Sequence, residues 1–294
     1  MRVLLVGSGG QLGRALRAAE WPPGSALIAL DRHALDITEP DAPAREIARW
    51  RPDIVVNAAA YTAVDRAESE PAAAFAANRD GPAHLAAACA AEGAALIHLS
   101  TDYVFDGDSD RPWRPSDPVR PLGVYGKSKA AGEEAVRQAL KRHVIVRTAW
   151  LHAAHGHNFV ATMLRAGRSA ERLRIVNDQI GAPTPAADLA RALSRIADRI
   201  HAEHGAYGTY HFCAEPAVSW HGFADAIFDT AARFGYPKPE LAGIPSDQWP
   251  TAAPRPCYSV LDCSTLQSDY GVSRSDWRTR LPAIVAALVD RDRG

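Results

Sequence analysis

The sequence has little lysine, little cysteine and no long hydrophobic run, and each shortage excludes a class of protein. Basic and acidic side chains nearly balance, 33 against 34, so no excess of positive charge is available to bind a nucleic acid. No apolar run approaches the ~18 residues that cross a membrane. The chain runs from Met1 directly into an apolar stretch without a signal-peptide pattern. We therefore predict a cytoplasmic protein with neither a membrane nor a nucleic-acid partner.

The four cysteines predict neither a disulfide framework nor a zinc knuckle. Cys89, Cys213, Cys257 and Cys263 lie far apart along the chain, and no two of them form a Cys-x-x-Cys pair. Three histidines crowd the stretch 152–157, but the sequence shows no fourth ligand that would complete a zinc site there. We predict no metal site.

The first half of the 294 residues alternates short apolar runs with alanine-rich helical patterns. Strands are predicted at Arg2–Val6, Ala26–Leu30, Asp53–Asn57, Ala94–Leu99 and His143–Arg147. Helices are predicted at Gln11–Glu20, Pro40–Trp50, Pro71–Ala91 and Val124–Leu140. Continuous apolar strands joined by helices are typical of a parallel sheet covered on both faces. The pattern therefore predicts an α/β fold, a doubly wound parallel sheet.

A glycine-rich turn separates the first predicted strand from the first predicted helix. Gly7, Gly10 and Gly13 follow the spacing Gly-x-x-Gly-x-x-Gly, with Gln11 and Leu12 between the last two. Glycines make such a turn tight, let backbone amides approach a pyrophosphate, and direct a helix N-terminus at its negative charge. The turn predicts a dinucleotide site on a Rossmann-type sheet and favours an enzyme of the short-chain dehydrogenase type. A structural turn without a ligand is the alternative.

The pattern loosens after Thr148, where we predict a second, smaller α/β substrate domain. Helical periodicity returns at Asn158–Arg168, Ala186–His201, His221–Phe234 and Arg280–Val289, and Gly208–Cys213 resembles a strand. The predicted dinucleotide-binding domain spans residues 1–149, and elements near 186–214 return to it. The predicted substrate domain spans residues 150–185 and 215–294.

The end of the second predicted strand leaves the choice between NADPH and NADH open. Asp31 stands where a carboxylate commonly accepts the adenosine ribose hydroxyls, whereas the adjacent Arg32 could hold a 2′-phosphate. Asp36 and Ile37 follow, and they could flank the adenine or simply belong to a capped loop. The three small residues Ala58, Ala59 and Ala60 would let the backbone approach the cofactor closely, and ordinary alanine-rich packing is the alternative.

Tyr125 and Lys129 stand four residues apart, on one face of a predicted helix. A phenol with its ordinary pKa of about 10 exchanges protons poorly at neutral pH, and a nearby ammonium lowers that pKa. The chain has 29 arginines and only 4 lysines, and two of the lysines, Lys127 and Lys129, lie in this stretch. Thr101 at the end of the fourth strand would supply a second hydrogen-bond donor to a carbonyl oxygen. An exposed helical pair is the alternative interpretation.

Several longer motifs resemble those of a known family. They are Gly-Gly-Gln-Leu-Gly at 9–13, Asn-Ala-Ala-Ala-Tyr-Thr-Ala-Val-Asp at 57–65, Ser-Thr-Asp-Tyr-Val-Phe-Asp-Gly at 100–107, Val-Tyr-Gly-Lys-Ser-Lys at 124–129 and Asn-Asp-Gln-Ile-Gly-Ala-Pro-Thr at 177–184. Together with Arg-Thr-Ala-Trp-Leu at 147–151 and Arg-Pro at 255–256, they resemble the dTDP-4-dehydrorhamnose reductases, which are extended short-chain dehydrogenase/reductases. The resemblance runs from residue 1 to about residue 289.

The resemblance implies reduction of the C4 carbonyl of dTDP-4-dehydro-β-L-rhamnose by NADPH or NADH. It implies that Tyr125 donates the proton, with Lys129 and Thr101 as its catalytic partners. The cofactor residues it implies, joined to those read from the turn, are Gly7, Gly10, Gln11, Leu12, Gly13, Asp31, Arg32, Asp36, Ile37, Ala60, Tyr61, Thr62, Leu99, Tyr125 and Lys129. The nucleotide-sugar residues it implies are Thr101, Asp102, Trp150, Asn177, Gln179 and Arg255.

One departure from the family bears on assembly. Some members are thought to dimerise through a divalent metal held by acidic residues on the first helix and on the helix after Thr184. Here the stretch 11–19 contains no acid, and Ala186 and Ala187 stand where an acid would be needed. We therefore expect a monomer or a homodimer without a metal bridge.

Two rival functions stay open at this point. Another nucleotide-sugar short-chain enzyme, an epimerase or dehydratase, is one, although a dehydratase is expected to follow Thr101 with Asp-Glu and here Asp102 precedes Tyr103. A non-catalytic subunit resembling the regulatory subunit of methionine adenosyltransferase is the other. The joint presence of Thr101, Tyr125 and Lys129 speaks against it. The tryptophans other than Trp150 are interpreted as packing residues, and Asp65 as a helix-start charge.

Overall fold

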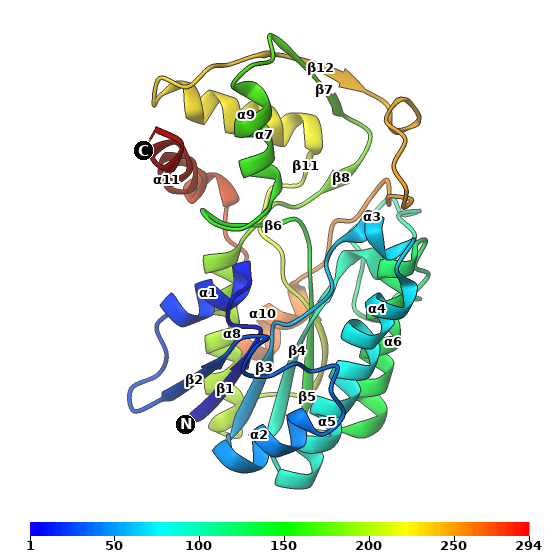
Figure 1. Ribbon diagram of the computed structural model, residues 1–294, viewed down its shortest axis with the longest axis vertical. Helices are drawn as coiled ribbons and strands as arrows, with labels where there is room; N and C mark the ends of the chain where they lie inside the picture. Colours follow the sequence, from blue (N-terminus) through cyan, green and yellow to red (C-terminus); the bar gives the residue numbers. More distant parts are fainter. Residues whose placement is uncertain (294) are drawn as a thin grey trace.

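A six-stranded parallel sheet forms the centre of the computed structural model, which describes residues 1–293 (Figure 1). The strands are β1 Arg2–Val6, β2 Ala26–Leu30, β3 Ile54–Asn57, β4 Ala95–Thr101, β5 His143–Thr148 and β10 Gly208–His211. Their order across the sheet is β10-β5-β4-β3-β1-β2. The prediction of a doubly wound parallel sheet is confirmed.

Helices cover both faces of this sheet. One face carries α1 Gln11–Ala18, α8 Ala186–His201 and α10 Ser264–Tyr270, and the other carries α2 Ala42–Trp50, α5 Gly81–Glu92 and α6 Val124–Ala139. In β1, Val3 and Leu5 pack into the first core, while Leu4 and Val6 pack into the second. Each such side chain contributes roughly 1.5–3 kcal/mol when buried. Burial on both faces is the reason that the strand reads as a continuous apolar run.

The structure corrects the single helix predicted at Pro71–Ala91. The segment divides into α4 Pro71–Phe75, a π-helical turn at Ala76–Asp80 and α5. Pro82 lacks the N–H that a continuous helix would need, so it lies in the first turn of α5 instead. Asn78 in the π turn bonds the backbone of Tyr61 and the hydroxyl of Ser128. The break therefore ties the segment after β3 to α6.

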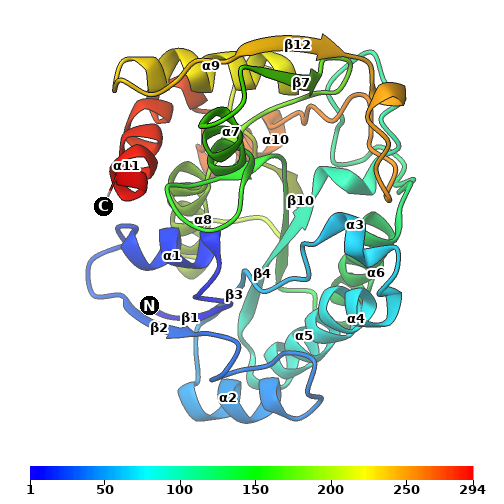
Figure 2. The ribbon, with the colours of Figure 1, turned by 45° about the horizontal axis from the view of Figure 1, so that its top comes forward.

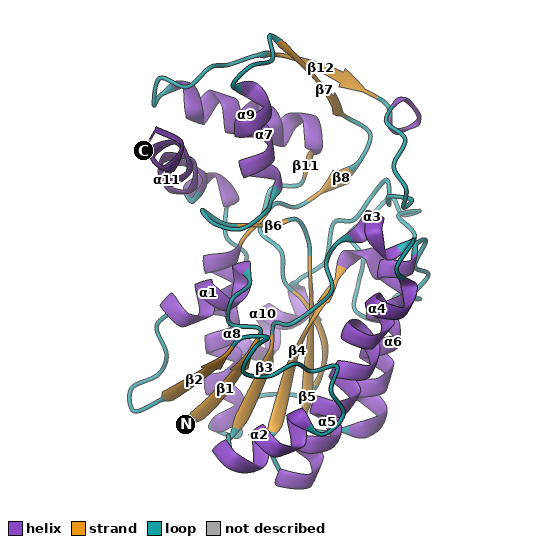
Figure 3. Cartoon of the chain, viewed as in Figure 1, coloured by secondary structure: helices purple, strands orange, loops and turns teal. Residues whose placement is uncertain are grey.

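A second group of elements lies beyond the carboxyl ends of the sheet strands (Figures 1 and 2). Its larger elements are α7 Phe159–Gly167, α9 Trp220–Ala232, α11 Leu281–Arg293, β7 Arg172–Val176 and β12 Glu240–Ile244. It has its own apolar core, which includes Val160, Phe223, Phe228 and Val285. β7 and β12, which pair in parallel as Figure 3 shows, were not predicted from the sequence. The domain bounds given above stay a prediction.

Short elements complete the connection between the two groups. They are α3 Val64–Ala67, β6 Leu151–His152, β8 Ile180–Gly181, β9 Thr184–Pro185 and β11 Val218–Ser219, with 3-10 turns at Asp102–Val104, Ser246–Gln248 and Trp277–Thr279. Among residues 1–293, no helix combines the length and the apolar composition needed to cross a membrane.

Candidate active site

A cavity of about 940 Å³ lies where the carboxyl ends of β1, β3, β4 and β5 face the second group of elements. Its wall is built from residues 9–12, 14, 58–60, 62–66, 99–103, 125, 129, 148–151, 155–158, 220 and 255. In a doubly wound fold this edge of the sheet is where ligands bind. The cavity thus joins residues that are up to 246 positions apart in the chain.

The glycine turn forms one end of the cavity, and two of its glycines have structural roles. Gly7 has φ +81°, and a Cβ there would stand 2.5 Å from the backbone nitrogen of Ala59. A Cβ at Gly13 would stand 2.2 Å from the carbonyl oxygen of Gly7. Gly10 and Gln11 line the cavity, and Gly10 precedes the first turn of α1. The unpaired amides of that turn suit a pyrophosphate.

Asp31 and Arg32 lie outside the cavity wall, at the end of β2. Asp31 is next to the turn, because a Cβ at Gly9 would stand 3.9 Å from the Cβ of Asp31. Arg32 is largely exposed and pairs with Asp36 at 3.2 Å. Ile37 is buried in the sheet core rather than on the cavity wall.

In the segment after β3, the small side chains line the cavity and the large side chain of Tyr61 lies outside it. Ala60 and Thr62 line the wall, whereas Tyr61 does not. The phenol of Tyr61 donates to Glu70 at 2.7 Å. The Tyr61 backbone N–H donates to Asn78 at 2.9 Å, which fixes the course of this segment.

Tyr125 and Lys129 lie one helical turn apart on α6, and both line the cavity beside Thr101. Burial raises the pKa of the Tyr125 phenol to about 12, and its hydrogen bond with Thr101 opposes that rise. The Lys129 ammonium donates to the carbonyl oxygen of Leu99 at 2.6 Å. The hydrogen bond with Thr101 is thus a contact that lowers the pKa of the phenol.

Two buried polar atoms on the cavity wall have no hydrogen-bond partner within residues 1–293. They are Oδ2 of Asp102 and Oγ1 of Thr148. Burial raises the pKa of the Asp102 carboxyl to about 6, although the carboxyl accepts a hydrogen bond from Thr101 at 3.0 Å. Most buried polar atoms in proteins have a hydrogen-bond partner. Two such atoms without a partner on one cavity wall therefore fit a site that binds a polar ligand.

An aromatic platform of Trp150 and Trp220 closes another side of the cavity. The two rings stack with centroids 3.3 Å apart and planes inclined by 4°. Trp150 has φ +47°, and a Cβ at Gly181 would stand 2.3 Å from its ring. Sequence reasoning placed Trp220 among the packing residues, because nothing in the local sequence indicates that it stacks on Trp150.

Arg255 reaches the cavity from the far end of the chain. It donates to Asp65 at 2.7 Å, and its guanidinium lies 5.9 Å from the ring centroid of Tyr103. Asp65 also accepts from the backbone N–H of Ala253 at 3.1 Å. The sequence interpretation of Asp65 as a helix-start charge missed this contact, since its partner is 190 residues away.

Asn177 and Gln179 are not brought to the cavity. The Gln179 amide donates to Ser246 at 2.9 Å, and Asn177 lies against Gly243 of β12. Both belong to the contact between the β7 end and the β12 end, so their assignment to the sugar stays a prediction.

A loop from the second group is latched onto the first residue of α1. Gln11 donates to the His157 carbonyl at 3.0 Å and accepts from Asn158 at 3.0 Å. The His155 ring contacts the Gln11 carbonyl at 3.1 Å. Sequence reasoning missed this latch. Within residues 1–293, no group of three or more His, Cys, Asp or Glu side chains is placed to hold a metal ion.

Comparisons with known proteins show that the chain is similar to dTDP-4-dehydrorhamnose reductases. Residues 1–289 match the family model described as the RmlD substrate binding domain. A dTDP-4-dehydrorhamnose reductase of Aggregatibacter actinomycetemcomitans is 42% identical over 97% of this chain and 98% of its own.

Two solved structures agree with this. The Clostridium acetobutylicum dTDP-4-dehydrorhamnose reductase is 36% identical, with a TM-score of 0.91 over 98% of this chain and 100% of its own. The Bacillus anthracis dTDP-4-dehydrorhamnose reductase in complex with NADP is 35% identical, with a TM-score of 0.89 over 97% of this chain and 98% of its own.

Proposed function

This chain belongs to the RmlD substrate binding domain family, and from that premise we propose that it reduces dTDP-4-dehydro-β-L-rhamnose to dTDP-L-rhamnose, the last step of dTDP-rhamnose synthesis. It is an oxidoreductase that acts on a carbonyl group with NADPH or NADH. The observation that carries the proposal is that Tyr125, Lys129 and Thr101 line the same cavity as the glycine turn and Arg255.

The residues present fit a reduced dinucleotide. The amides at the start of α1 and the small side chains of Ala58–Ala60 leave room and donors for its pyrophosphate. Asp31 stands at the end of β2, where it can accept hydrogen bonds from a ribose. The Lys129 ammonium, already directed at the Leu99 carbonyl, is in place to hold the second ribose. When bound, the cofactor supplies the hydride.

Three side chains of this protein handle the substrate carbonyl. The Tyr125 phenol is protonated at neutral pH, as an ordinary phenol is, and burial raises its pKa further, to about 12. It donates its proton to the carbonyl oxygen. The Thr101 hydroxyl has one proton, which it donates to Asp102 in this structure. It holds the substrate oxygen, and then stabilises the phenolate that the transfer leaves, once that proton has turned from Asp102 toward the cavity. The Lys129 ammonium supplies the nearby positive charge, which favours the phenolate once the proton has moved.

The rest of the cavity suits the nucleotide. The flat face of the Trp150 and Trp220 pair offers a stacking surface for a base, and Arg255 offers a guanidinium to a pyrophosphate. The resemblance of the motif at 177–184 to the family supports the proposal that Asn177 and Gln179 contact the nucleotide-sugar. A cytoplasmic location and a monomeric or homodimeric state are part of the proposal.

The direct test is consumption of NADPH with dTDP-4-dehydrorhamnose supplied by its upstream enzymes. Wild-type protein is expected to oxidise NADPH in step with formation of dTDP-L-rhamnose. Tyr125→Phe is expected to bind NADPH normally and to lower turnover by roughly two to four orders of magnitude, the effect of losing a general acid. Tyr207→Phe, which changes an exposed phenol, is the matched control.

Two outcomes would contradict the proposal. Absence of NADPH oxidation by a folded wild-type protein that binds NADPH would favour a non-catalytic subunit. Conversion of the nucleotide-sugar without net NADPH consumption would favour an epimerase or a dehydratase.

A further inference from the structure

A buried ion pair lies directly behind the catalytic residues. Glu133 of α6 and Arg147 of β5 have side chains that are 0% and 3% exposed, and they form two hydrogen bonds, at 2.6 and 2.8 Å. The Ser100 hydroxyl donates to the same carboxylate at 2.6 Å. None of these three residues is needed to explain proton or hydride transfer.

The pair connects the elements that carry the catalytic side chains. Ser100 lies in β4 between Leu99, which accepts from Lys129, and Thr101, which bonds Tyr125. Ser100 and Arg147 are register partners across β4 and β5. Because the Glu133 carboxylate bonds both residues, it fixes the β4 end against α6. The separation of Thr101 from the Tyr125 helix therefore depends on this carboxylate.

Glu133 also acts on Lys129 through its charge. It follows Lys129 by four residues on α6, so the two side chains share one face of the helix. Burial lowers the pKa of Lys129 to about 8, and the Glu133 carboxylate opposes that fall. Although burial raises the pKa of Glu133, the hydrogen bond from Arg147 and the charge of Arg147 hold it below its ordinary value. The carboxylate is therefore ionised at neutral pH.

We propose that Glu133 is a positioning residue for the reduction: its carboxylate keeps Lys129 charged and holds the strand end that carries Thr101 at its working distance from α6. This inference rests on the proposed function and extends it to a residue that does not line the cavity.

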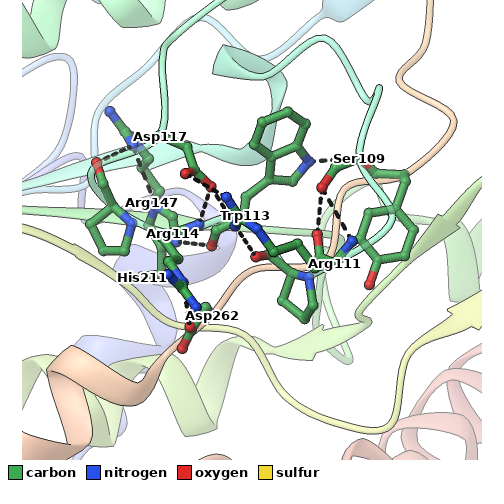
Figure 4. Close-up of polar contacts among 11 residues, drawn as sticks. Ser109, Arg111, Trp113, Arg114, Asp117, Arg147, His211 and Asp262 are labelled. Atoms are coloured by element: carbon green, nitrogen blue, oxygen red, sulfur yellow. Dashed lines mark hydrogen bonds and ion pairs between the residues drawn. The ribbon is translucent and has the colours of Figure 1, made fainter.

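The outer side of the pair is closed by further contacts, so Arg147 has little freedom to leave Glu133. Figure 4 shows Arg147 beside His211 and Trp113. One guanidinium nitrogen contacts the His211 ring at 3.3 Å and donates to the Pro115 carbonyl at 3.3 Å. The other nitrogen of the His211 ring contacts the Trp113 carbonyl at 3.0 Å. Burial lowers the pKa of His211 to about 3, so this ring stays neutral and adds no charge.

One further charged group faces the carboxylate. Arg137, one turn beyond Glu133 on α6, donates to it at 3.3 Å from a half-exposed position. Lys129, Arg137 and Arg147 are thus the cations around Glu133, with His211 neutral behind them.

Of these cations only Lys129 can lose its proton near neutral pH, because arginines keep theirs. The ring of His98 on β4, which interacts with the Lys129 charge, is neutral because burial holds its pKa well below the ordinary value. Burial raises the pKa of the Asp102 carboxyl only to about 6, so a fall in activity on the basic side of neutrality points to Lys129.

The first test compares pH profiles of kcat/KM for the nucleotide-sugar at saturating NADPH. The reaction needs the Lys129 ammonium, so activity falls as pH rises through the pKa of Lys129. In Glu133→Gln that pKa drops, and the basic limb is expected to move to lower pH by about one unit. Glu133→Asp keeps the charge, so its basic limb should return to the wild-type pH even if its kcat/KM is lower.

Glu134→Gln is the matched control. It makes the same chemical change at the next residue, on a side chain that is 55% exposed and, within residues 1–293, bonds only Arg137 and Gln138. Its basic limb should coincide with that of the wild type. A Glu133→Gln variant that is slower at every pH but has an unmoved limb would overturn the proposal, since a merely structural role predicts that result.

The second test measures the Lys129 charge directly and needs no substrate. The chain has only 4 lysines, so protein labelled with 15N at the lysine side chains gives a spectrum in which Lys129→Met assigns the Lys129 signal. The pKa of Lys129 should fall in Glu133→Gln and stay in Glu134→Gln. If it falls while the wild type fails to reduce the nucleotide-sugar, the proposed function fails and the electrostatic role of Glu133 stands.

Glu133→Gln leaves the Arg147 charge buried without its partner, and an unpaired buried charge destabilises the fold. Glu133→Gln combined with Arg147→Gln removes both charges and is expected to move the limb in the same direction by a smaller amount, because the Arg147 charge that repels the Lys129 ammonium is lost as well. The wild type provides a further check in every case. A Lys129 that titrates below neutral pH in the wild type, and is therefore not held charged, would overturn the proposal.

Discussion

At the scale of single residues, the cavity wall holds groups whose burial works against the stability of the folded chain. Asp102 is the clearest case, since one carboxylate oxygen has no partner within residues 1–293 and burial raises the pKa of the carboxyl to about 6. The folded state holds a proton that the unfolded state releases between pH ~4 and ~6, so stability falls as pH rises through that window. Such a residue indicates a role in binding rather than in folding.

Asp102→Asn is therefore expected to stabilise the protein above pH ~6, by about 1–3 kcal/mol, and to leave stability nearly unchanged at pH ~4. The amide has no charge to bury, so the pH-dependent penalty disappears. Urea unfolding at both pH values measures the difference. The same variant should reduce the nucleotide-sugar more slowly. Asp106→Asn, in the loop that follows, is the control, and equal stabilisation at both pH values would contradict the explanation.

We propose that Asp31 and Arg32, at the end of β2, set the preference between NADPH and NADH. Arg32 is exposed and held by Asp36, a surface pair that contributes little and can open to accept a 2′-phosphate. We expect weak discrimination between NADPH and NADH, and Arg32→Ala should shift the preference toward NADH. The ratio of kcat/KM for the two cofactors measures this. A wild-type ratio above about a thousandfold, ~4 kcal/mol, would show that one of the two residues dominates.

At the scale of elements, the site depends on backbones that approach more closely than side chains would allow. The glycine turn packs against Ala58 and Ala59, which follow β3, and against its own first residue, as the positions of Gly7 and Gly13 show. On α6, a Cβ at Gly132 would stand 1.9 Å from the Asn78 carbonyl oxygen, so this glycine lets α6 approach the π turn. Motif spacing alone does not distinguish such glycines from those that face the ligand.

Gly13→Ala should destabilise the fold, whereas Gly10→Ala should not. The added Cβ at Gly13 would overlap the backbone of Gly7 and Ser8, and overpacking of this kind costs typically 1–3 kcal/mol. At Gly10 the nearest atom would be 3.5 Å away, an ordinary contact. Thermal unfolding of the two variants makes the comparison. Equal melting temperatures would show that α1 shifts to admit the methyl group at position 13.

At the scale of the whole molecule, the cavity exists only because the two groups of elements meet. Arg255 comes from the segment after β12, yet it is held by Asp65 of α3. Trp150 and Trp220 of the second group stack on the wall of the same cavity, and the 155–158 loop of that group is latched to Gln11 of α1. Binding energy gathered from these remote parts orients the reacting carbonyl, so its loss should slow the chemical step as well as weaken binding.

Arg255→Ala is expected to reduce kcat/KM for the dTDP-sugar by about 2–4 kcal/mol in transition-state terms and to leave NADPH binding unchanged. The variant removes the guanidinium that we assign to the pyrophosphate. Steady-state kinetics and calorimetry with NADPH measure the two effects. Arg172→Ala, which removes an exposed arginine paired with Glu240, is the control. If Arg255→Ala lost NADPH binding, Arg255 would belong to the cofactor site, and its assignment to the nucleotide-sugar would be wrong.

The sequence alone determined the sheet, the glycine turn and the pairing of Tyr125 with Lys129, because these follow from local periodicity and short spacings. It also identified the family, through motifs distributed from residue 9 to residue 256. Only the tertiary structure decided which distant residues meet: Asp65 with Arg255, Trp150 with Trp220, and Glu133 with Ser100 and Arg147. Such contacts join separate elements, and their partners are chosen by packing in three dimensions, which no local pattern records.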